Sequence, residues 1–274
     1  MDTYSYDQDG KPIEKLSWCA YLDILGYKQE LIVNDNSNAS QEYLNRIYSA
    51  MSKYVAYDSF DSKKPFPKDS FIKYKIFSDN IVFGLPFDSV GDPTSEGEFG
   101  SLLIQIAYFQ LLLALENIFI RGGFTLGRLY IGSELVFGKA LLDAYEIESK
   151  VSVNPRIVMS EPVKSVILQQ LKSTDKDAPQ IKMLLKDVDG KWFINYLYMT
   201  VNDYDGGIML ELLLKHKENI EANLLKYKQE PTIRLKYLWL SNYHNYFCDQ
   251  YKINDPVYRI NSSIGSSSIA DITS

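Results

Sequence analysis

Two aspartates stand out in the 274-residue sequence because each interrupts an apolar segment. Asp23 lies inside residues 20–27, and Asp79 lies between the apolar pairs at 76–77 and 81–82. A carboxylate at the end of a core strand costs free energy unless an opposite charge compensates it. Each aspartate could serve as a cap, a turn former or an ion-pair partner. A divalent cation held by both is the more consequential hypothesis, because Mg²⁺ and Mn²⁺ take oxygen ligands and share them with substrate phosphates.

The apolar pattern places both aspartates at strand ends. Residues 17–25 are typical of a strand that ends at Gly26, and residues 71–85 predict a hairpin whose turn holds Ser78, Asp79 and Asn80. Further strands are expected at residues 121–137 (a pair), 156–159 and 192–198, and helices at 38–55, 101–117, 139–150, 160–171, 206–228 and 232–251. Because several strand pairs are hairpins, we predict an α+β domain with a mixed or antiparallel sheet flanked by helices.

Composition narrows the functional classes. The formal net charge of -6 argues against a dedicated nucleic-acid binder. The two cysteines, Cys19 and Cys248, lie in apolar surroundings, which favours reduced thiols and the cytoplasm. Residues 1–15 are polar and lack the pattern of a signal peptide. The apolar stretch at 102–120 is interrupted by polar residues such as Gln105 and Gln110, so we expect a buried core helix and no membrane association.

Four segments resemble, in order, the motifs of class III adenylyl and guanylyl cyclases, and together they cover roughly residues 17–159. They are Asp23-Ile24-Leu25-Gly26-Tyr27 (Asp-Ile-x-Gly-Phe), Lys75-Ile76-Phe77-Ser78-Asp79 with Phe83-Gly84-Leu85-Pro86 (Lys-x-x-Gly-Asp with Gly-Leu-Pro), Arg121-Gly122-Gly123-Phe124-Thr125-Leu126-Gly127 (Arg-x-Gly-x-x-x-Gly), and Phe137-Gly138 with Ala144 and Glu148 (the Trp-Gly helix). The resemblance implies a ferredoxin-like cyclase domain over residues 17–200. An N-terminal tail (1–16), a helical extension (201–260) and a disordered, Ser-rich tail (261–274) would flank it.

Finer features are similar to the pyrimidine cyclases of bacterial Pycsar anti-phage systems. They are Arg121-Gly122-Gly123, Phe137-Gly138-Lys139-Ala140-Leu141, Ala144-Tyr145-Glu146-Ile147-Glu148-Ser149, Pro155-Arg156-Ile157 and the aromatic segment Lys236-Tyr237-Leu238-Trp239-Leu240 with Tyr243-His244-Asn245. This resemblance implies a homodimeric lyase with its sites at the interface. It would convert UTP or CTP to the 3′,5′-cyclic monophosphate, which a separate effector reads.

The resemblance also implies roles for individual residues. Asp23 and Asp79 would be the catalytic carboxylates and hold two Mn²⁺ or Mg²⁺ ions about 3.5–4 Å apart, with the carbonyl oxygen of Ile24 as a further ligand. Substrate would be bound by the backbone N–H groups of Leu25, Gly26 and Tyr27, which suit a triphosphate, and by Lys73, Tyr74, Lys75, Asn80 and Arg121. Lys73, Tyr74 and Lys75 occupy the region where purine cyclases read the base.

One departure from the family pattern leaves alternatives open. The helix after Phe137-Gly138 carries Leu142 and Glu146 where the purine cyclases carry an asparagine and an arginine that position the ribose and the transition state. Another cation could substitute, the candidates being Arg121, Arg128, Lys139 and Lys150. The alternatives are a purine cyclase with the same mechanism and a catalytically inactive, nucleotide-binding homologue. For His216 and His244, on the last two helices, we predict a helix-packing or surface role in preference to a catalytic one.

Overall fold

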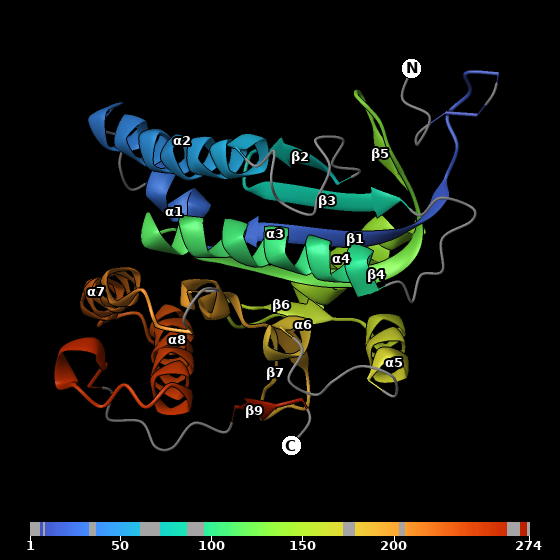
Figure 1. The fold of residues 1–274 in the computed structure, drawn as a ribbon. Helices are drawn as coiled ribbons and strands as arrows, with labels where there is room; N and C mark the ends of the chain where they lie inside the picture. Colours follow the sequence, from blue (N-terminus) through green and yellow to red (C-terminus); the bar gives the residue numbers. More distant parts are fainter. Residues whose placement is uncertain are drawn as a thin grey trace.

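The structure is a computed structural model that describes residues 6–7, 9–32, 37–60, 72–86, 96–171, 179–202, 206–261 and 269–272. Within these ranges no helix is long and apolar enough to cross a bilayer. The described chain forms one sheet with helices on both of its faces (Figure 1).

The sheet has the strand order β2-β3-β1-β4-β6-β8-β7-β9, and β5 pairs with the far end of β4. Every pair is antiparallel except β4 with β6. This confirms the predicted α+β class with a mixed, mostly antiparallel sheet. The strands are β1 (Lys15–Ile24), β2 (Lys73–Phe77), β3 (Asn80–Pro86), β4 (Ile120–Ile131), β5 (Val136–Phe137), β6 (Ile157–Met159), β7 (Leu184–Lys186), β8 (Trp192–Ile194) and β9 (Ala270–Asp271).

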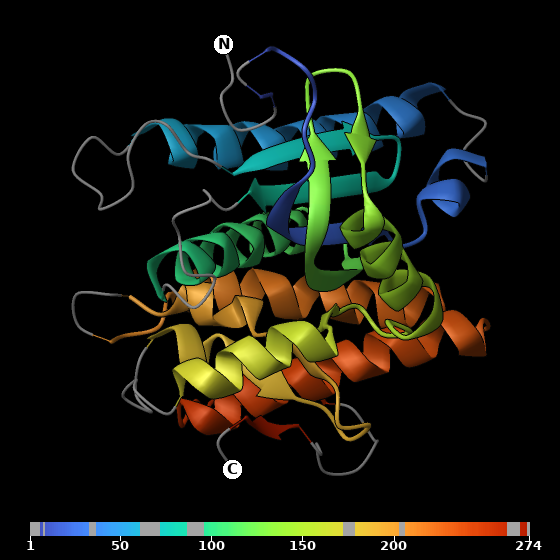
Figure 2. The same ribbon diagram turned by 90° about the vertical axis from the view of Figure 1, so that its right-hand side faces the viewer.

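The helices divide between the two faces of the sheet. Helices α2 and α3 cover one face and α4 covers the other, while α7 and α8 lie beyond α3 at the β6–β9 end of the domain (Figures 1 and 2). The helices are α1 (Tyr27–Ile32), α2 (Ser37–Phe60), α3 (Glu96–Leu115), α4 (Lys139–Lys150), α5 (Glu161–Gln170), α6 (Pro179–Lys182), α7 (Leu210–Lys226) and α8 (Pro231–Gln250), with 3-10 turns η1 (Tyr196–Thr200) and η2 (Pro256–Tyr258).

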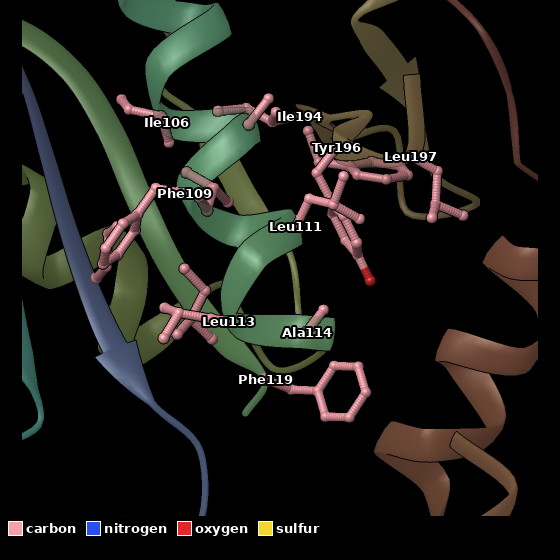
Figure 3. Close-up of a cluster of buried hydrophobic side chains, with 14 of the residues drawn as sticks. Ile106, Phe109, Leu111, Leu113, Ala114, Phe119, Ile194, Tyr196 and Leu197 are labelled. Atoms are coloured by element: carbon pink, nitrogen blue, oxygen red, sulfur yellow. The ribbon is translucent and has the colours of Figure 1, made fainter. Parts of the chain in front are cut away.

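Helix α3 is the centre of the main hydrophobic core. Its apolar residues are buried on all sides of the helix, as predicted for the stretch that was too polar for a membrane span. Figure 3 shows Phe109 on the side of the sheet and Leu111 on the side of Tyr196 in η1. Because α3 lies between the sheet and the C-terminal helices, it fixes the position of α7 and α8 relative to β1.

Two expectations about the C-terminal half are wrong. The predicted strand at 192–198 ends at Ile194 and continues as η1. The predicted disordered tail is wrong at residues 269–272, where Ile269 is buried, β9 pairs with β7, and Asp271 accepts a 3.0 Å hydrogen bond from the Tyr246 hydroxyl. Residues 262–268 and 273–274 of that tail lie outside the described residues. The predicted domain boundaries stay predictions.

Two buried histidines link the C-terminal helices through a directed hydrogen-bond chain. His244 Nε2 lies 2.7 Å from the carbonyl oxygen of Tyr258, which can only accept, so Nε2 carries the proton. The Nδ1 of neutral His244 is then an acceptor for His216 Nδ1–H at 2.9 Å. The Nε2 of His216 in turn accepts from the Tyr196 hydroxyl at 2.7 Å. Both side chains are completely buried, so of the two predicted roles the structure supports helix packing. The hydrogen-bond chain requires both rings to be neutral.

This chain predicts that the fold loses stability in acid. Burial, with Lys217 and Arg259 nearby, lowers the pKa of His244 to about 4, and burial lowers the pKa of His216 well below its usual range. Because the unfolded histidines titrate near pH 6.5, stability is fully present above that pH and falls as the pH drops from there toward 4. At pH 5 we expect His244 alone to reduce the free energy of unfolding by about 2 kcal/mol relative to pH 7.5.

Urea unfolding at the two pH values measures this loss. The His216→Gln/His244→Gln variant, whatever its absolute stability, should have a smaller difference between pH 7.5 and pH 5 than the wild type. Equal pH dependence in the two proteins would contradict the neutral-histidine chain.

Candidate active site

The fold brings Asp23 and Asp79 to the same end of the sheet. Asp23 is opposite Asn80 in the β1–β3 ladder, and the N–H of Ile24 donates to the carbonyl oxygen of Asp79 at 2.9 Å. Ser78 has a φ of 59°, which closes the tight turn between β2 and β3. The predicted hairpin turn therefore holds Asp79 against the last residues of β1.

Asp79 is oriented by two polar neighbours. Asn80 Nδ2 donates to Asp79 Oδ1 at 3.0 Å, and the Tyr21 hydroxyl donates to Asn80 Oδ1. Burial, together with Glu148, Asp23 and other acidic neighbours, raises the pKa of Tyr21 to about 12. Tyr21 therefore stays a protonated donor. The hydrogen bond from Asn80 engages only Oδ1 of Asp79, so it leaves Oδ2 available for a ligand.

Arg121 of β4 lies between two carboxylates. It is opposite Asp23 in the β1–β4 ladder, its Nε donates to Asp23 Oδ2 at 3.2 Å, and its Nη2 forms a 2.6 Å ion pair with Glu148 Oε1 without hydrogen-bond alignment. Glu148 is almost completely buried. Burial raises the pKa of both carboxyl groups, and Arg121 acts against that rise at each. Arg121 thus compensates two carboxylates at once.

The glycines of the Arg-Gly-Gly segment allow helix α4 to reach this position. A Cβ atom on Gly123 would lie 2.2 Å from the carbonyl oxygen of Ala144, so only glycine permits the close packing of α4 on β4. The buried stripe of α4 consists of Ala140, Ala144 and Glu148, one helical turn apart. From the sequence, Glu148 is part of a family motif and has no predicted site function. Its position in line with Ala140 and Ala144 is the sequence signal that indicates a buried carboxylate.

The turn after β1 departs from one prediction. Gly26 has a φ of +75°, a conformation that favours glycine, and turns the chain into α1. The N–H of Leu25, predicted to bind triphosphate, instead donates to the carbonyl oxygen of Phe119 at 2.9 Å. The ring of Tyr27 packs against Tyr43. Leu25 therefore has a structural role through its N–H, and the roles of Gly26 and Tyr27 stay predictions.

The three substrate-binding residues predicted on β2 point to different faces of the sheet. Lys73 and Lys75 share one face, where their ammonium groups donate to the carbonyl oxygens of Ile131 (3.4 Å) and Ser133 (2.8 Å). Tyr74 lies on the opposite face, with its ring among core residues of the α2–α3 side. The strand alternation thus separates Tyr74 from the two lysines, and the three cannot act as one cluster.

Only one of the four cations proposed as a substitute arginine contacts the carboxylates. Arg128 is exposed on β4, Lys139 pairs with Asp143 and Lys150 pairs with Glu146, so Arg121 alone of the four lies beside Asp23. Leu142 and Glu146, the two residues at the departing positions, are exposed on α4. Within its own chain, α4 therefore contributes Glu148 to this region and neither of those residues.

A further cation comes from the C-terminal extension. Lys236 of α8 is half-buried, and burial lowers the pKa of its ammonium group. Arg121 lowers it further, whereas Asp23 and Glu148 act in the opposite direction, which places Lys236 within electrostatic reach of all three. From the sequence, Lys236 is named only as part of the aromatic segment and has no predicted site role, because α8 lies more than 200 positions from Asp23 and carries no local signal beyond its aromatic pattern.

The residues at this end of the sheet fit a divalent cation that is completed by a substrate. In the described part of the chain, no group of three or more His, Cys, Asp or Glu side chains is arranged to hold a metal ion. Asp23 and Asp79 nevertheless offer hard carboxylate oxygens, and Asp79 is one of the charges that raise the pKa of Asp23. Mg²⁺ is commonly held by one or two carboxylates together with substrate phosphates. The pair therefore suits a cation that arrives with a phosphorylated ligand.

Comparison with known proteins gives distant, partial similarities. Neither a protein-family model nor a curated protein matches the chain. Among solved structures it is similar to a class III adenylyl cyclase-like ATP-binding protein from Pseudomonas aeruginosa, with a TM-score of 0.38 and 13% identity over 56% of this chain and 35% of that protein. It is also similar to the catalytic core of a rhodopsin-guanylyl cyclase with converted specificity, in complex with ATPαS, with a TM-score of 0.39 and 14% identity over 66% of this chain and 97% of that core. The chain thus spans about a third of the length of the first protein.

The position of Arg121 predicts a strong coupling with Glu148. Arg121→Met leaves the buried Glu148 carboxylate without its counter-charge, so we expect it to lower the free energy of unfolding by about 2–4 kcal/mol. Adding Glu148→Leu removes that buried charge, and the double variant should recover a large part of the loss. Urea unfolding of the wild type, both single variants and the double variant provides the cycle. Additive losses would contradict the assignment of Arg121 as the partner of Glu148.

Proposed function

We propose that this protein is a metal-dependent nucleotidyl cyclase that converts UTP or CTP to the 3′,5′-cyclic monophosphate and pyrophosphate. One observation carries the proposal: Asp23, near the end of β1, and Asp79, in the β2–β3 turn, lie at the same sheet end and are linked through the hydrogen bond from the Ile24 N–H to the Asp79 carbonyl oxygen. Paired carboxylates at a strand end are the donor set for divalent cations that bind nucleotide phosphates.

Each residue of the site would have a defined task. Asp23 and Asp79 would hold Mn²⁺ or Mg²⁺, which when bound supplies charge neutralisation and lowers the pKa of the ribose 3′-hydroxyl. Asn80, held by Tyr21, would keep Asp79 in position. Arg121 would fix the orientation of Asp23. The 3′-oxygen then bonds to the α-phosphorus, the bond to the bridging α–β oxygen breaks, and the hydroxyl proton leaves to solvent. Catalysis is by positioning and electrostatic stabilisation.

A homodimer is part of the same proposal. Leu135, Phe137, Leu142 and Tyr145 are exposed apolar side chains on two successive segments, residues 135–137 (which include β5) and helix α4, and Leu142 is 64% exposed. Exposed apolar side chains concentrated on neighbouring elements are typical of an interaction surface. A second copy of the chain, packed through α4, would cover them.

The pyrimidine preference and the biological role rest on sequence resemblance. The segments around Arg121, Phe137, Ala144 and Pro155 resemble Pycsar cyclases, which supports UTP or CTP over ATP or GTP as the substrate. The cyclic product would then activate a separate effector in anti-phage defence.

One observation favours a second candidate, a catalytically silent nucleotide-binding protein. Arg121, the substitute cation beside Asp23, is already engaged by two carboxylates, and α4 offers Leu142 and Glu146 where cyclases use Asn and Arg. Such a protein would bind a nucleoside triphosphate with Mn²⁺ and release no pyrophosphate.

The cyclase proposal predicts cyclic nucleotide production from a single substrate class. Purified protein is incubated with Mn²⁺ and each of UTP, CTP, ATP and GTP separately, and products are identified by mass spectrometry. We expect cyclic UMP or cyclic CMP. Asp79→Asn, which keeps the size of the side chain and removes its charge, should reduce the rate by about 10³-fold or more.

Asp143→Asn is the matched control, because Asp143 is an aspartate on α4 whose carboxylate pairs with Lys139 away from Asp23. Its rate should equal that of the wild type. Cyclic AMP or cyclic GMP as the product would overturn the pyrimidine assignment. Metal-dependent binding of nucleotide without any cyclic product would favour the silent binding protein.

A further inference from the structure

An ion pair and aromatic contacts hold the connection between α7 and α8 against the region that follows β1. Lys226, at the end of α7, forms an ion pair with Glu30 of α1. The ring of Tyr227 stacks on Tyr237 of α8 at a centroid distance of 5.6 Å and an interplanar angle of 5°. Tyr237 also contacts Phe119, the residue whose carbonyl oxygen holds the Leu25 N–H. The first turns of α8 are therefore a fixed wall beside the end of β1.

A small cavity lies between this wall and the β1–α1 turn. Its volume is about 60 Å³, and it is lined by Leu25, Gly26, Gln29, Tyr227, Ile233, Lys236 and Tyr237. A space of this size holds a few water molecules, so it is too small for a nucleoside. It could take the oxygen atoms at the end of a polyphosphate chain. Lys236 supplies the cationic group in its lining.

Lys236 differs from Arg121 in having no fixed anionic partner. Within the ranges that the structure describes, its ammonium group makes neither an ion pair nor a hydrogen bond, although the side chain is half-buried. Arg121 by contrast is engaged by Asp23 and Glu148. An ammonium group has three donors, and a half-buried one without partners is costly unless an anion is bound there. Lys236 thus has the capacity for a ligand that Arg121 lacks.

We propose that Lys236 is a phosphate-binding residue that the C-terminal extension contributes to the active site of its own chain, where it receives the outer phosphates of the nucleoside triphosphate. This inference deepens the proposed cyclase function and rests on it for the identity of the ligand. The lysine lies beside the turn at Leu25 and Gly26 and within electrostatic reach of Asp23, so a triphosphate anchored by the two aspartates would extend toward it. The helical extension would then contribute a substrate-binding residue to the active site.

The test measures polyphosphate binding separately from turnover. Isothermal titration of the full chain with inorganic tripolyphosphate in the presence of Mg²⁺ needs no cyclase activity. Lys236→Gln removes the charge and keeps most of the side-chain length, and we expect it to weaken binding at least tenfold. Lys236→Arg should bind within threefold of the wild type. Lys228→Gln is the matched control, because Lys228 is an exposed lysine at the same α7–α8 corner.

Kinetics provide the second readout. With the nucleotide that the wild type cyclises, Lys236→Gln should raise KM at least tenfold and change kcat much less, whereas a lysine that only supports the fold would lower the melting temperature and leave KM unchanged. Tripolyphosphate affinity that is equal in Lys236→Gln and wild type, or absent in the wild type, overturns the inference. If the wild type binds tripolyphosphate through Lys236 and forms no cyclic product, the inference stands and the cyclase proposal falls.

Discussion

Asp23 and Glu148 can share the interior at the end of β1 because a single guanidinium, that of Arg121, lies between them. Neither carboxylate could be buried alone at acceptable cost. This constraint reaches far into the fold. It requires β4 to pair with β1 in the register that sets Arg121 opposite Asp23, and it requires α4 to approach β4 closely enough for Glu148 to reach the same side chain. Gly123 is the residue that makes this approach possible.

The polar groups at this end of the sheet fall into two sets: those already bonded to protein partners and those available to bind a ligand. Arg121 and the Leu25 N–H are both committed to protein partners. Asp79 and Lys236 can still make further contacts. Asp79 is oriented by Asn80, and Lys236 lies on helix α8, whose position is fixed by the stacking of Tyr237 on Tyr227 and by the nearby Lys226–Glu30 ion pair. Asp79 is anionic and Lys236 cationic, as a site for a metal-bound phosphate chain requires. The C-terminal helices therefore pack on α3 in the core, and α8 also places Lys236 beside the β1–α1 turn.

The sequence predicted the parts of this arrangement that depend on local pattern. The β2–β3 hairpin, the buried α3 and the span of α4 follow from turn chemistry and periodicity, and the aspartates are conspicuous because they interrupt apolar runs. What it could not predict depends on contacts between distant segments. The carbonyl of Phe119 takes the Leu25 N–H, alternation along β2 places Tyr74 on the core side, and Lys236 approaches Asp23 only because α7 and α8 pack beyond α3. Likewise, Ile269 is buried and β9 pairs with β7, although the Ser-rich composition around them favours disorder.

The central claim, that Asp23 and Asp79 together hold a divalent cation that arrives with a nucleoside triphosphate, is most directly tested by Mn²⁺ binding. Electron paramagnetic resonance titration reports free Mn²⁺ in the presence of protein and a non-cyclisable 3′-deoxy nucleoside triphosphate. The account predicts that the wild type retains Mn²⁺ beyond what the nucleotide alone binds, and that Asp23→Asn and Asp79→Asn each lose this retention while Asp143→Asn keeps it. Equal Mn²⁺ retention by the wild type and both site variants would contradict the claim.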